Sequence, residues 1–255
     1  MNKLKAGLRT LALLLVAVGL APSAGAQDWP QRAVKVILPF GPGGTSDTVV
    51  RSYAEKLSQA LGQQFVVEYR SGAGGAIGIE TVAKATPDGY TMGLSNLAAL
   101  AVIPNGRKVA YDPFKDFAPV GRVADQIIGI ATNLQVPAAS LQELIALAKA
   151  KPGALSYSSA GIGSATHFVG EILKQSAGID LTHVPYRGGA EALVDVLAGH
   201  VQIQIEGIVF AQARAGKMRL LGVTTPGRYS EFPDVPAIAE VVPGFSFDNW
   251  FGFIF

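Results

Sequence analysis

The sequence predicts a two-lobed α/β protein with mostly parallel sheets flanked by helices. Short apolar segments of strand length alternate with longer amphipathic segments, which is typical of βαβ units. A strand, a glycine turn and a helix start follow one another in both halves of the chain. The composition, with 49% hydrophobic residues, 16% charged residues and 30 glycines, suits buried strands that are joined by tight turns.

The first 26 residues have the layout of a secretory signal peptide. Three basic residues precede an apolar run over 11–21, and small residues follow up to Ala26. The run is shorter than the roughly 20 residues that a transmembrane helix needs, so we expect cleavage after Ala26. The chain has no cysteine that could carry a lipid anchor. We therefore expect a mature protein that is free in the periplasm.

The charge balance excludes several classes of function. The chain has 21 Lys and Arg against 19 Asp and Glu, and removing 1–26 leaves 18 basic residues and a formal net charge of −1. Without a basic cluster, nucleic-acid binding has no electrostatic support. The absence of cysteine excludes thiolate chemistry, and the histidines lack the spacing of metal ligands. We expect no metal and no cofactor.

The first lobe is predicted over 27–124. Val34–Leu38 reads as a buried strand that stops at Pro39, and a glycine turn follows over 40–44. The next helix has N-cap candidates in Thr45–Asp47 and ends at Gly62. Further along, we expect a strand at 65–69, a glycine turn at 72–75, a helix over about 77–85 and a strand at 90–94. This βαβαβ order predicts parallel strands, with ligands beyond their carboxyl ends.

The second lobe is predicted over 125–246, after an irregular stretch from Pro104 to Pro119. A capping box formed by Ser140 and Glu143 begins one of its helices. A second glycine turn over 159–163 precedes a helix over about 164–177. The remaining elements are strands at 127–131, 155–158, 181–184, 201–205 and 218–223 and a helix over 190–198.

The last residues, 247–255, read as a strand that completes the first lobe. No turn or capping signal follows this strand, and an open apolar edge would be an aggregation hazard in a natural terminus. We therefore expect the sequence to be truncated at its C-terminus.

The two glycine turns are candidates for anion binding. Phe40–Asp47 and Ala160–Ser164 each place residues without a Cβ before a helix start. Backbone N–H groups can approach a ligand there, and the helix terminus carries about half a positive charge. Each terminus contributes about 0.3–1 kcal/mol, so two turns that converge could capture a small anion. Either turn alone could equally be a plain connection between strand and helix.

Other motifs fit the sequence less well. The turn 41–45 lacks the Gly-Lys-Ser/Thr ending of a P-loop, and Gly72-x-Gly74 lacks the third glycine of the dinucleotide fingerprint. An exported α/β hydrolase that uses Ser164, with His167 and Asp195, stays open as an alternative, although Ser164 is not in a G-x-S-x-G elbow.

An ordered set of motifs, which covers the mature chain, resembles the Bug family of periplasmic solute-binding proteins of tripartite tricarboxylate transporters. The motifs are Pro39–Asp47 with Arg51, Gly72–Gly78, Pro87–Thr91, Tyr111–Val120, Gly163–His167, Val184–Gly188 and Pro233–Pro236. The resemblance implies a two-domain Venus-flytrap fold with the ligand in the cleft between the domains. It also implies a protein that is not an enzyme and that continues past residue 255.

The same resemblance implies that the two turns grip a ligand carboxylate or carbonyl group, largely through backbone N–H groups and ordered waters. On this sequence the implied ligand-binding residues are Phe40, Gly43, Gly44, Thr45, Ala73, Gly74, Ser95, Ala160, Gly161, Gly163, Ser164 and Glu206. Asp47 is expected to fix the first turn, and His167 and Tyr186 either line or support the cleft.

Two departures from the family pattern bear on ligand identity. Glu206 stands where many relatives have aspartate, and it could bind an amino or hydroxyl group or repel a second carboxylate. Arg70 stands where relatives have asparagine, and it could balance extra negative charge or stay at the surface. We expect a monomer that captures a small organic acid, which could be a carboxylate, an amino acid or an aromatic acid. The expected partners are membrane permease subunits, although a sensor subunit would bind its ligand in the same way.

Overall fold

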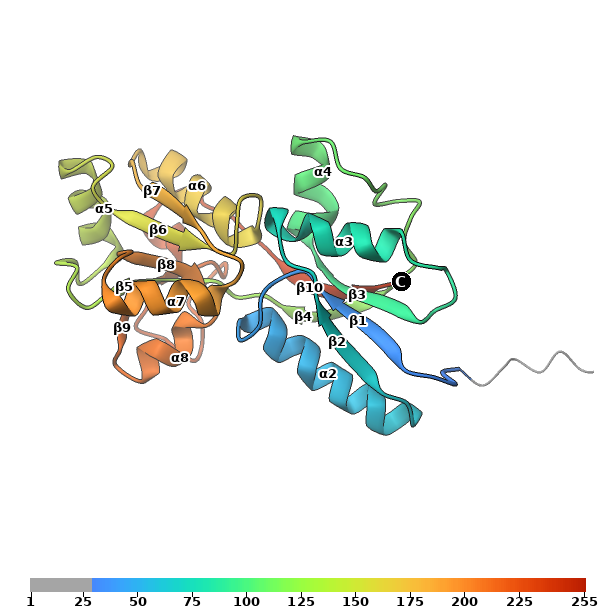
Figure 1. The fold of residues 1–255 in the computed structure, drawn as a ribbon. Helices are drawn as coiled ribbons and strands as arrows, with labels where there is room; N and C mark the ends of the chain where they lie inside the picture. The colour runs from blue at the N-terminus through green and yellow to red at the C-terminus, as the bar shows by residue number, and fades with distance from the viewer. Residues whose placement is uncertain (1–28) are drawn as a thin grey trace, which may run out of the picture. The chain divides into compact units, whose positions relative to one another are not determined.

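Two five-stranded sheets organise residues 32–255 of the protein (Figure 1). The structure is a computed structural model that describes residues 29–255, so the predicted signal peptide lies outside the described residues. Within 29–255, no helix has the length and apolarity needed to cross a membrane.

The first sheet has the strand order β2-β1-β3-β10-β4. Its strands are β1 (Val34–Leu38), β2 (Phe65–Tyr69), β3 (Thr91–Asn96), β4 (Pro119–Asp125) and β10 (Trp250–Ile254). β1 pairs in parallel with β2 and β3, whereas β10 lies antiparallel between β3 and β4. The C-terminal strand therefore belongs to the sheet that the N-terminal strands build.

Helices cover both faces of the first sheet because successive side chains of β1 point to opposite sides. Val34, Val36 and Leu38 pack with Val50 of α2 on one face. Ile37 packs on the other face with residues of α3 and α4. The helical segments are α2 (Thr45–Leu61), the 3₁₀ turn η1 (Ala73–Gly75), α3 (Ala76–Ala83), the π-helical turn η2 (Ala98–Val102) and α4 (Ile103–Gly106).

The second sheet has the strand order β7-β6-β8-β5-β9. Its strands are β5 (Gly129–Asn133), β6 (Ser156–Ser159), β7 (Thr182–Pro185), β8 (Ile203–Glu206) and β9 (Met218–Val223). β6 pairs in parallel with β7 and β8, and β5 runs antiparallel to β8 and β9.

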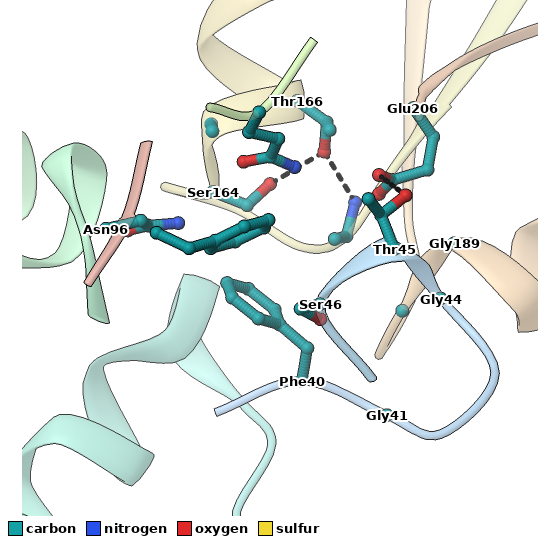
Figure 2. Close-up of a pocket in the computed structure, with 15 residues that line it drawn as sticks. Phe40, Gly41, Gly44, Thr45, Ser46, Asn96, Ser164, Thr166, Gly189 and Glu206 are labelled. Atoms are coloured by element: carbon teal, nitrogen blue, oxygen red, sulfur yellow. Dashed lines mark hydrogen bonds between the residues drawn. The ribbon is translucent and has the colours of Figure 1, made fainter. Parts of the chain in front are cut away.

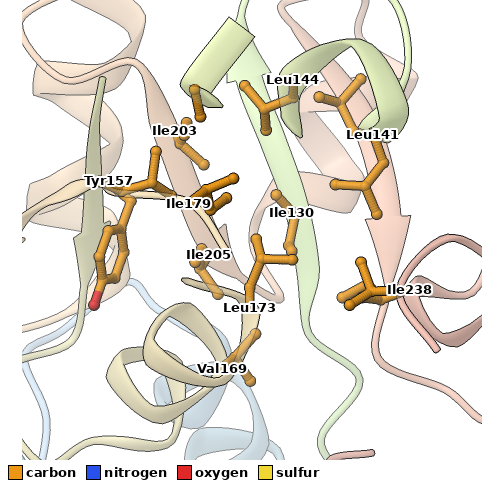
Figure 3. Packing of buried hydrophobic residues seen from close by; sticks show 14 of the residues in the cluster. Ile130, Leu141, Leu144, Tyr157, Val169, Leu173, Ile179, Ile203, Ile205 and Ile238 are labelled. Carbon is orange, nitrogen blue, oxygen red and sulfur yellow. The ribbon is translucent and has the colours of Figure 1, made fainter. Parts of the chain in front are cut away.

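Two apolar clusters lie on the faces of the second sheet. Ile130 and Ile205 pack with Leu144 and Leu173 in the larger one (Figure 3). Ala131, the neighbour of Ile130, packs on the opposite face with Val196 and Val209. The helices are α5 (Leu141–Ala150), α6 (Ala165–Ala177), α7 (Gly189–Ala198), α8 (Val209–Arg214) and α9 (Ile238–Val241). Half of the predicted capping box is present, since Ser140 Oγ accepts from Glu143 N–H. The Glu143 carboxylate accepts from Ala139 N–H, one residue before the N-cap, instead of from Ser140 N–H.

The sheets are mixed, so the expectation of mostly parallel sheets holds only for β1–β3 and for β6–β8. The reason is that the chain passes between the sheets from β4 to β5 and returns from β9 to β10, and the strands beside these passages run antiparallel to their neighbours. Strand β4, the helical segments η2 and α4, and helices α8 and α9 were not predicted. β4 begins at a proline and is mostly exposed, so it lacks the apolar pattern that identifies a buried strand.

The two connections between the sheets lie side by side. Gln126 N–H donates to the carbonyl oxygen of Asn249 at 3.0 Å, and the Asn249 side-chain amide donates to Gln126 Oε1. Both residues are buried. The passage from the first sheet to the second is thus hydrogen-bonded to the return passage.

A stack of rings supports the turn that follows β6. The His183 ring lies 4.8 Å from the Tyr157 ring and 4.3 Å from the His167 ring, measured between centroids. His183 Nε2 is 2.7 Å from Ser159 Oγ, and Tyr157 donates to Glu171 Oε1 at 2.7 Å. Burial, followed by the nearby His167, lowers the pKa of His183 to about 4. Both imidazoles are therefore neutral at pH 7, and His183 holds the Ser159 hydroxyl in place.

Gly170 of α6 is required by its contact with Tyr157. A Cβ at this position would lie 2.3 Å from Tyr157 Cε2, and Tyr157 is fully buried. We expect Gly170→Ala to lower the free energy of unfolding by about 1–3 kcal/mol, although alanine favours helices. Urea denaturation measures the change. Gly106→Ala is the control because a Cβ there meets nothing within 4 Å, and an equal loss in both variants would contradict the packing explanation.

The depressed pKa of His183 makes stability depend on pH. The folded state keeps this imidazole neutral down to about pH 4, whereas an unfolded histidine takes up its proton near pH 6.5. The unfolded state therefore binds more protons in this window, and stability falls as the pH drops from 6.5 to 4. We expect His183 to contribute about 2 kcal/mol to the free energy of unfolding at pH 7, a value that already allows for its partial exposure.

Urea titrations at pH 7, 5.5 and 4.5 compare the wild type with His183→Gln, which removes the titrating group but keeps a polar side chain beside Ser159. The difference in unfolding free energy between the two proteins should shrink as the pH falls. A constant difference would show that His183 does not titrate in this window. Glu171 and Lys174 of α6 also act on the His183 pKa, and both are present in the two proteins.

Candidate functional site

A pocket lies where the first and second glycine turns meet (Figure 2). Both halves of the unit over 32–255 contribute to its walls. The lining residues are Phe40, Gly41, Gly44, Thr45, Ser46, Asn96, Gln126, Ala160, Ser164, Ala165, Thr166, Gly188, Gly189, Glu206 and Phe251. The cavity volume is about 20 Å³, which is room for about one water molecule. A small organic acid can enter only when the walls move.

Three helices begin at this pocket. The N-cap residues of α2, α6 and α7 are Gly44, Ser164 and Gly188, and all three line it. No side chain caps α2 or α7, and Ser164 caps α6 by accepting from His167 N–H. Uncapped N–H groups and the partial positive charge of a helix N-terminus favour an anion. The pocket therefore suits a carboxylate.

Asp47 fixes the first turn. Its Oδ2 accepts from Gly43 N–H at 2.8 Å, and its Oδ1 accepts from Arg51 Nε at 3.0 Å and from the Tyr69 hydroxyl at 2.8 Å. Burial alone would raise the pKa of Asp47, but the bonds from Gly43, Tyr69 and Arg51 outweigh it and lower the pKa. Asp47 is thus ionised and holds the turn, as expected for this residue.

Side chains of the second half already bind the N–H groups of the second turn. Ala160 N–H donates to Thr166 Oγ1 at 2.9 Å, Gly161 N–H to Ser159 Oγ at 3.1 Å and Gly163 N–H to His167 Nδ1 at 3.3 Å. The main-chain donors that were expected to bind a ligand here therefore have partners within the turn. His167 supports the turn from behind, and Tyr186 donates to Asp195 at 2.6 Å; neither lines the pocket.

Hydroxyl groups supply a donor at the second wall instead. Ser164 Oγ and Thr166 Oγ1 lie 3.1 Å apart, and each also accepts from a backbone N–H group. Only one of the two hydroxyl hydrogens can lie between the two oxygens. The other is available to a guest in the pocket.

The two halves touch through main-chain atoms. Gly41 N–H donates to the Arg187 carbonyl oxygen at 3.0 Å. Gly74, in the left-handed region with φ of 65°, lies against the second turn, where an added Cβ would be 2.5 Å from the Ile162 oxygen and 2.8 Å from Ser164 N. A side chain at position 74 would keep the turns apart.

Glu206 links the halves at the pocket. It is 5% exposed, and its Oε1 accepts from the Thr45 hydroxyl at 3.2 Å and from Gly207 N–H at 2.8 Å. Figure 2 shows Thr45 and Glu206 facing each other from opposite walls. Burial raises the pKa of Glu206, although the hydrogen bonds from Gly207, Thr45 and Gln126 oppose this increase.

The pocket contains some of the sequence-predicted ligand-binding residues but not others. Those that line it are Phe40, Gly44, Thr45, Ala160, Ser164 and Glu206, and those that do not are Gly43, Ala73, Gly74, Ser95, Gly161 and Gly163. Ser95 is replaced by its neighbour Asn96, because adjacent residues of a strand point to opposite faces. Arg70 pairs with Glu68 at the surface.

Several lining residues were missed. Gly188 and Gly189 begin α7 beside the first turn, and the Gly188–Gly189 pair was the one sequence signal of this wall. Gln126 and Phe251 come from the connection between the sheets and from β10, so only the tertiary fold brings them to the pocket.

The hydrolase alternative lacks its geometry. Ser164 Oγ has Thr166 Oγ1 and His167 N–H as hydrogen-bond partners, while His167 Nδ1 accepts from Gly163 N–H. The imidazole of His183 contacts Ser159 instead. Among the described residues, no group of three or more metal-ligating side chains is present.

Comparison with known proteins identifies the family of the chain. Residues 49–255 match the model of the tripartite tricarboxylate transporter family receptor, TctC. Protein BugT of Bordetella pertussis is 35% identical over 252 residues, which cover 96% of this chain and 76% of BugT.

Two solved structures of Rhodopseudomonas palustris are similar as well. Rpa4515 with adipate is 36% identical with a TM-score of 0.84, covering 89% of this chain and 77% of that one. MatC with bound malate is 32% identical with a TM-score of 0.83, and the match covers 89% of this chain and 78% of MatC. The resemblance to the Bug family and the periplasmic-binding-protein fold are thus confirmed, and a receptor rather than an enzyme is the expected type. The chain belongs to the tripartite tricarboxylate transporter receptor family.

Proposed function

We propose that the protein binds a small organic carboxylate in the pocket between the two turns and delivers it to the permease subunits of a tripartite transporter. The observation that carries this proposal is the convergence of the N-termini of α2, α6 and α7 on one pocket. The relatives solved with adipate and malate support the choice of a carboxylate.

The ligand contacts that we propose come from the pocket walls. The first turns of α2 and α7 supply N–H groups, and the free hydroxyl hydrogen of the Ser164–Thr166 pair and the Asn96 amide donate to the carboxylate. Thr45 lines the pocket, but its hydroxyl donates to Glu206. Asn96 Oδ1 already accepts from Ala99 N–H at 2.9 Å, which leaves its Nδ2 as a donor. Gly43, Ala73, Gly74, Gly161 and Gly163 act behind these walls by shaping the turns, and Ser95 lies on β3 beside Asn96.

We further propose that the halves move as two lobes. Residues 27–124 with 247–255 form one lobe and 125–246 the other, and they hinge near 124–126 and 246–250. The small volume of the pocket requires such an opening for a ligand to enter. Closure then gives the ligand contacts that exist in one state only, which is the condition for shifting a two-state equilibrium. The mature protein acts as a monomer in the periplasm, released there by its signal peptide.

Calorimetric titration tests the capture of an acid. The full-length mature protein is titrated with mono-, di- and tricarboxylates, amino acids and aromatic acids. We expect at least one acid to bind with a micromolar dissociation constant. If every acid bound more weakly than about 1 mM, the proposed function would be wrong.

Gly74→Ala tests the contact between the turn at 72–75 and the second glycine turn. The added Cβ would collide with the Ile162 oxygen, so we expect at least a tenfold loss of affinity for the best acid in the titration. The left-handed backbone also costs about 1 kcal/mol of stability for any residue with a Cβ.

Gly62→Ala is the matched control, since it has a φ of 69° and nothing within 4 Å of an added Cβ. The control should lose similar stability in thermal melts and keep its affinity. Equal affinities for the two variants would contradict a role for the contact between the turns in binding.

A further inference from the structure

Glu206 is the one charged side chain among the residues that line the pocket. It emerges at the end of β8 and is buried against α7, where a Cβ on Gly189 would lie 2.6 Å from Glu206 Cγ. Its carboxyl group is therefore held beside the three helix N-termini, in the region where we place the ligand carboxylate.

The groups that face Glu206 supply no positive charge. Thr45 faces it from α2, Gly207 from its own strand end and Gln126 from the connection between the sheets, and all are neutral. The charged residues nearest in sequence to these positions are Asp47, Asp125, Glu191 and Arg187, and the Arg187 side chain is exposed. Asp47 pairs with Arg51 and Asp125 with Arg122, while Glu191 accepts from Arg187 N–H.

A second ionised carboxylate in this pocket would meet strong repulsion. Two ionised carboxylates a few ångströms apart repel each other strongly where little water screens them. The partial charges of three helix N-termini at best offset that repulsion. Two carboxyl groups that share one site avoid this cost when one of them keeps a proton.

The hydrogen bonds of Glu206 show which oxygen can carry that proton. The Thr45 hydroxyl and Gly207 N–H both donate to Oε1, so Oε1 acts as the acceptor. Oε2 accepts from neither of these two groups and lies on the side of Gly189 at the start of α7, so it is the oxygen that can carry a proton. The hydrogen bond from Gln126 to this carboxyl group opposes protonation. A hydroxyl at Oε2 can donate to an anion bound at the helix N-termini.

We infer that Glu206 binds the ligand in its protonated form, with its Oε2 hydroxyl donating to the ligand carboxylate, so that one proton is retained for each anion captured. This inference rests on the proposed function and adds that ligand binding is coupled to the binding of a proton by Glu206. Burial, which raises the pKa of Glu206, acts in the same direction. When the pocket opens to water and Glu206 ionises, binding requires proton uptake, and affinity falls as the pH rises.

Calorimetry with adipate and with malate tests this coupling between pH 6 and 9, where both carboxyl groups of each acid are ionised, since ordinary carboxyl pKa values are about 4. Buffers of different ionisation enthalpy report the protons taken up. We expect the wild-type dissociation constant to rise at least tenfold over this range, with up to one proton taken up per ligand.

Glu206→Gln places an amide donor where the protonated oxygen would be. We expect this variant to bind with the wild-type affinity of pH 6 at every pH and to take up no proton. Glu55→Gln, which removes a carboxylate from the exposed surface of α2, should keep the wild-type pH dependence. Circular dichroism checks that both variants are folded, and the wild-type buffer dependence stands alone if Glu206→Gln does not fold.

The outcomes separate the two proposals. The proton coupling is overturned if wild-type binding is independent of pH and buffer, or if the affinity of Glu206→Gln depends on pH as the wild-type affinity does. Either result leaves the proposed function intact. If neither acid binds the wild type at pH 6, the proposed capture of such acids is wrong, and the coupling falls with it.

Discussion

The approach of two backbone turns to within hydrogen-bonding distance is the constraint on which the site depends. Gly41 N–H reaches the Arg187 carbonyl oxygen at 3.0 Å, and Gly74 lies where a Cβ would overlap the Ile162 oxygen. Close contact between main chains demands residues without side chains. It also demands that each turn keep its shape, which Asp47 ensures in the first half and Ser159 in the second.

The pocket attracts an anion through oriented dipoles and not through formal positive charge. Its lining residues include no lysine and no arginine, and helix N-termini provide the favourable field. A dipolar site of this kind is local, because the field of a helix end falls off within about one turn. It therefore suits a carboxylate at one place, and in the proposed function the neighbouring side chains recognise the rest of the ligand.

The sequence predicted the parts of the fold that local patterns control. β1 and β2 were predicted with their observed bounds, since apolar runs that end at proline or glycine identify buried strands. β4 lacks an apolar run and was missed. At the site, the turn residues Gly44 and Ser164 were found from their place before helices, whereas Gln126 and Thr166 were not. Gln126 and Thr166 line the pocket because the fold brings together chain segments that are far apart in sequence. Asn96 lines it in place of the predicted Ser95, because neighbouring residues of a strand point to opposite faces.

The paired connections at Gln126 and Asn249 limit how the molecule can deform. The two connections lie side by side and are hydrogen-bonded to each other, so they resist twisting of one half against the other. Such a twist would pull Asn249 away from Gln126 and break buried hydrogen bonds. Bending about the line that joins the links leaves those bonds intact. The proposed movement of the two lobes is thereby reduced to a single soft degree of freedom, so that one angle would distinguish the loaded state from the empty one.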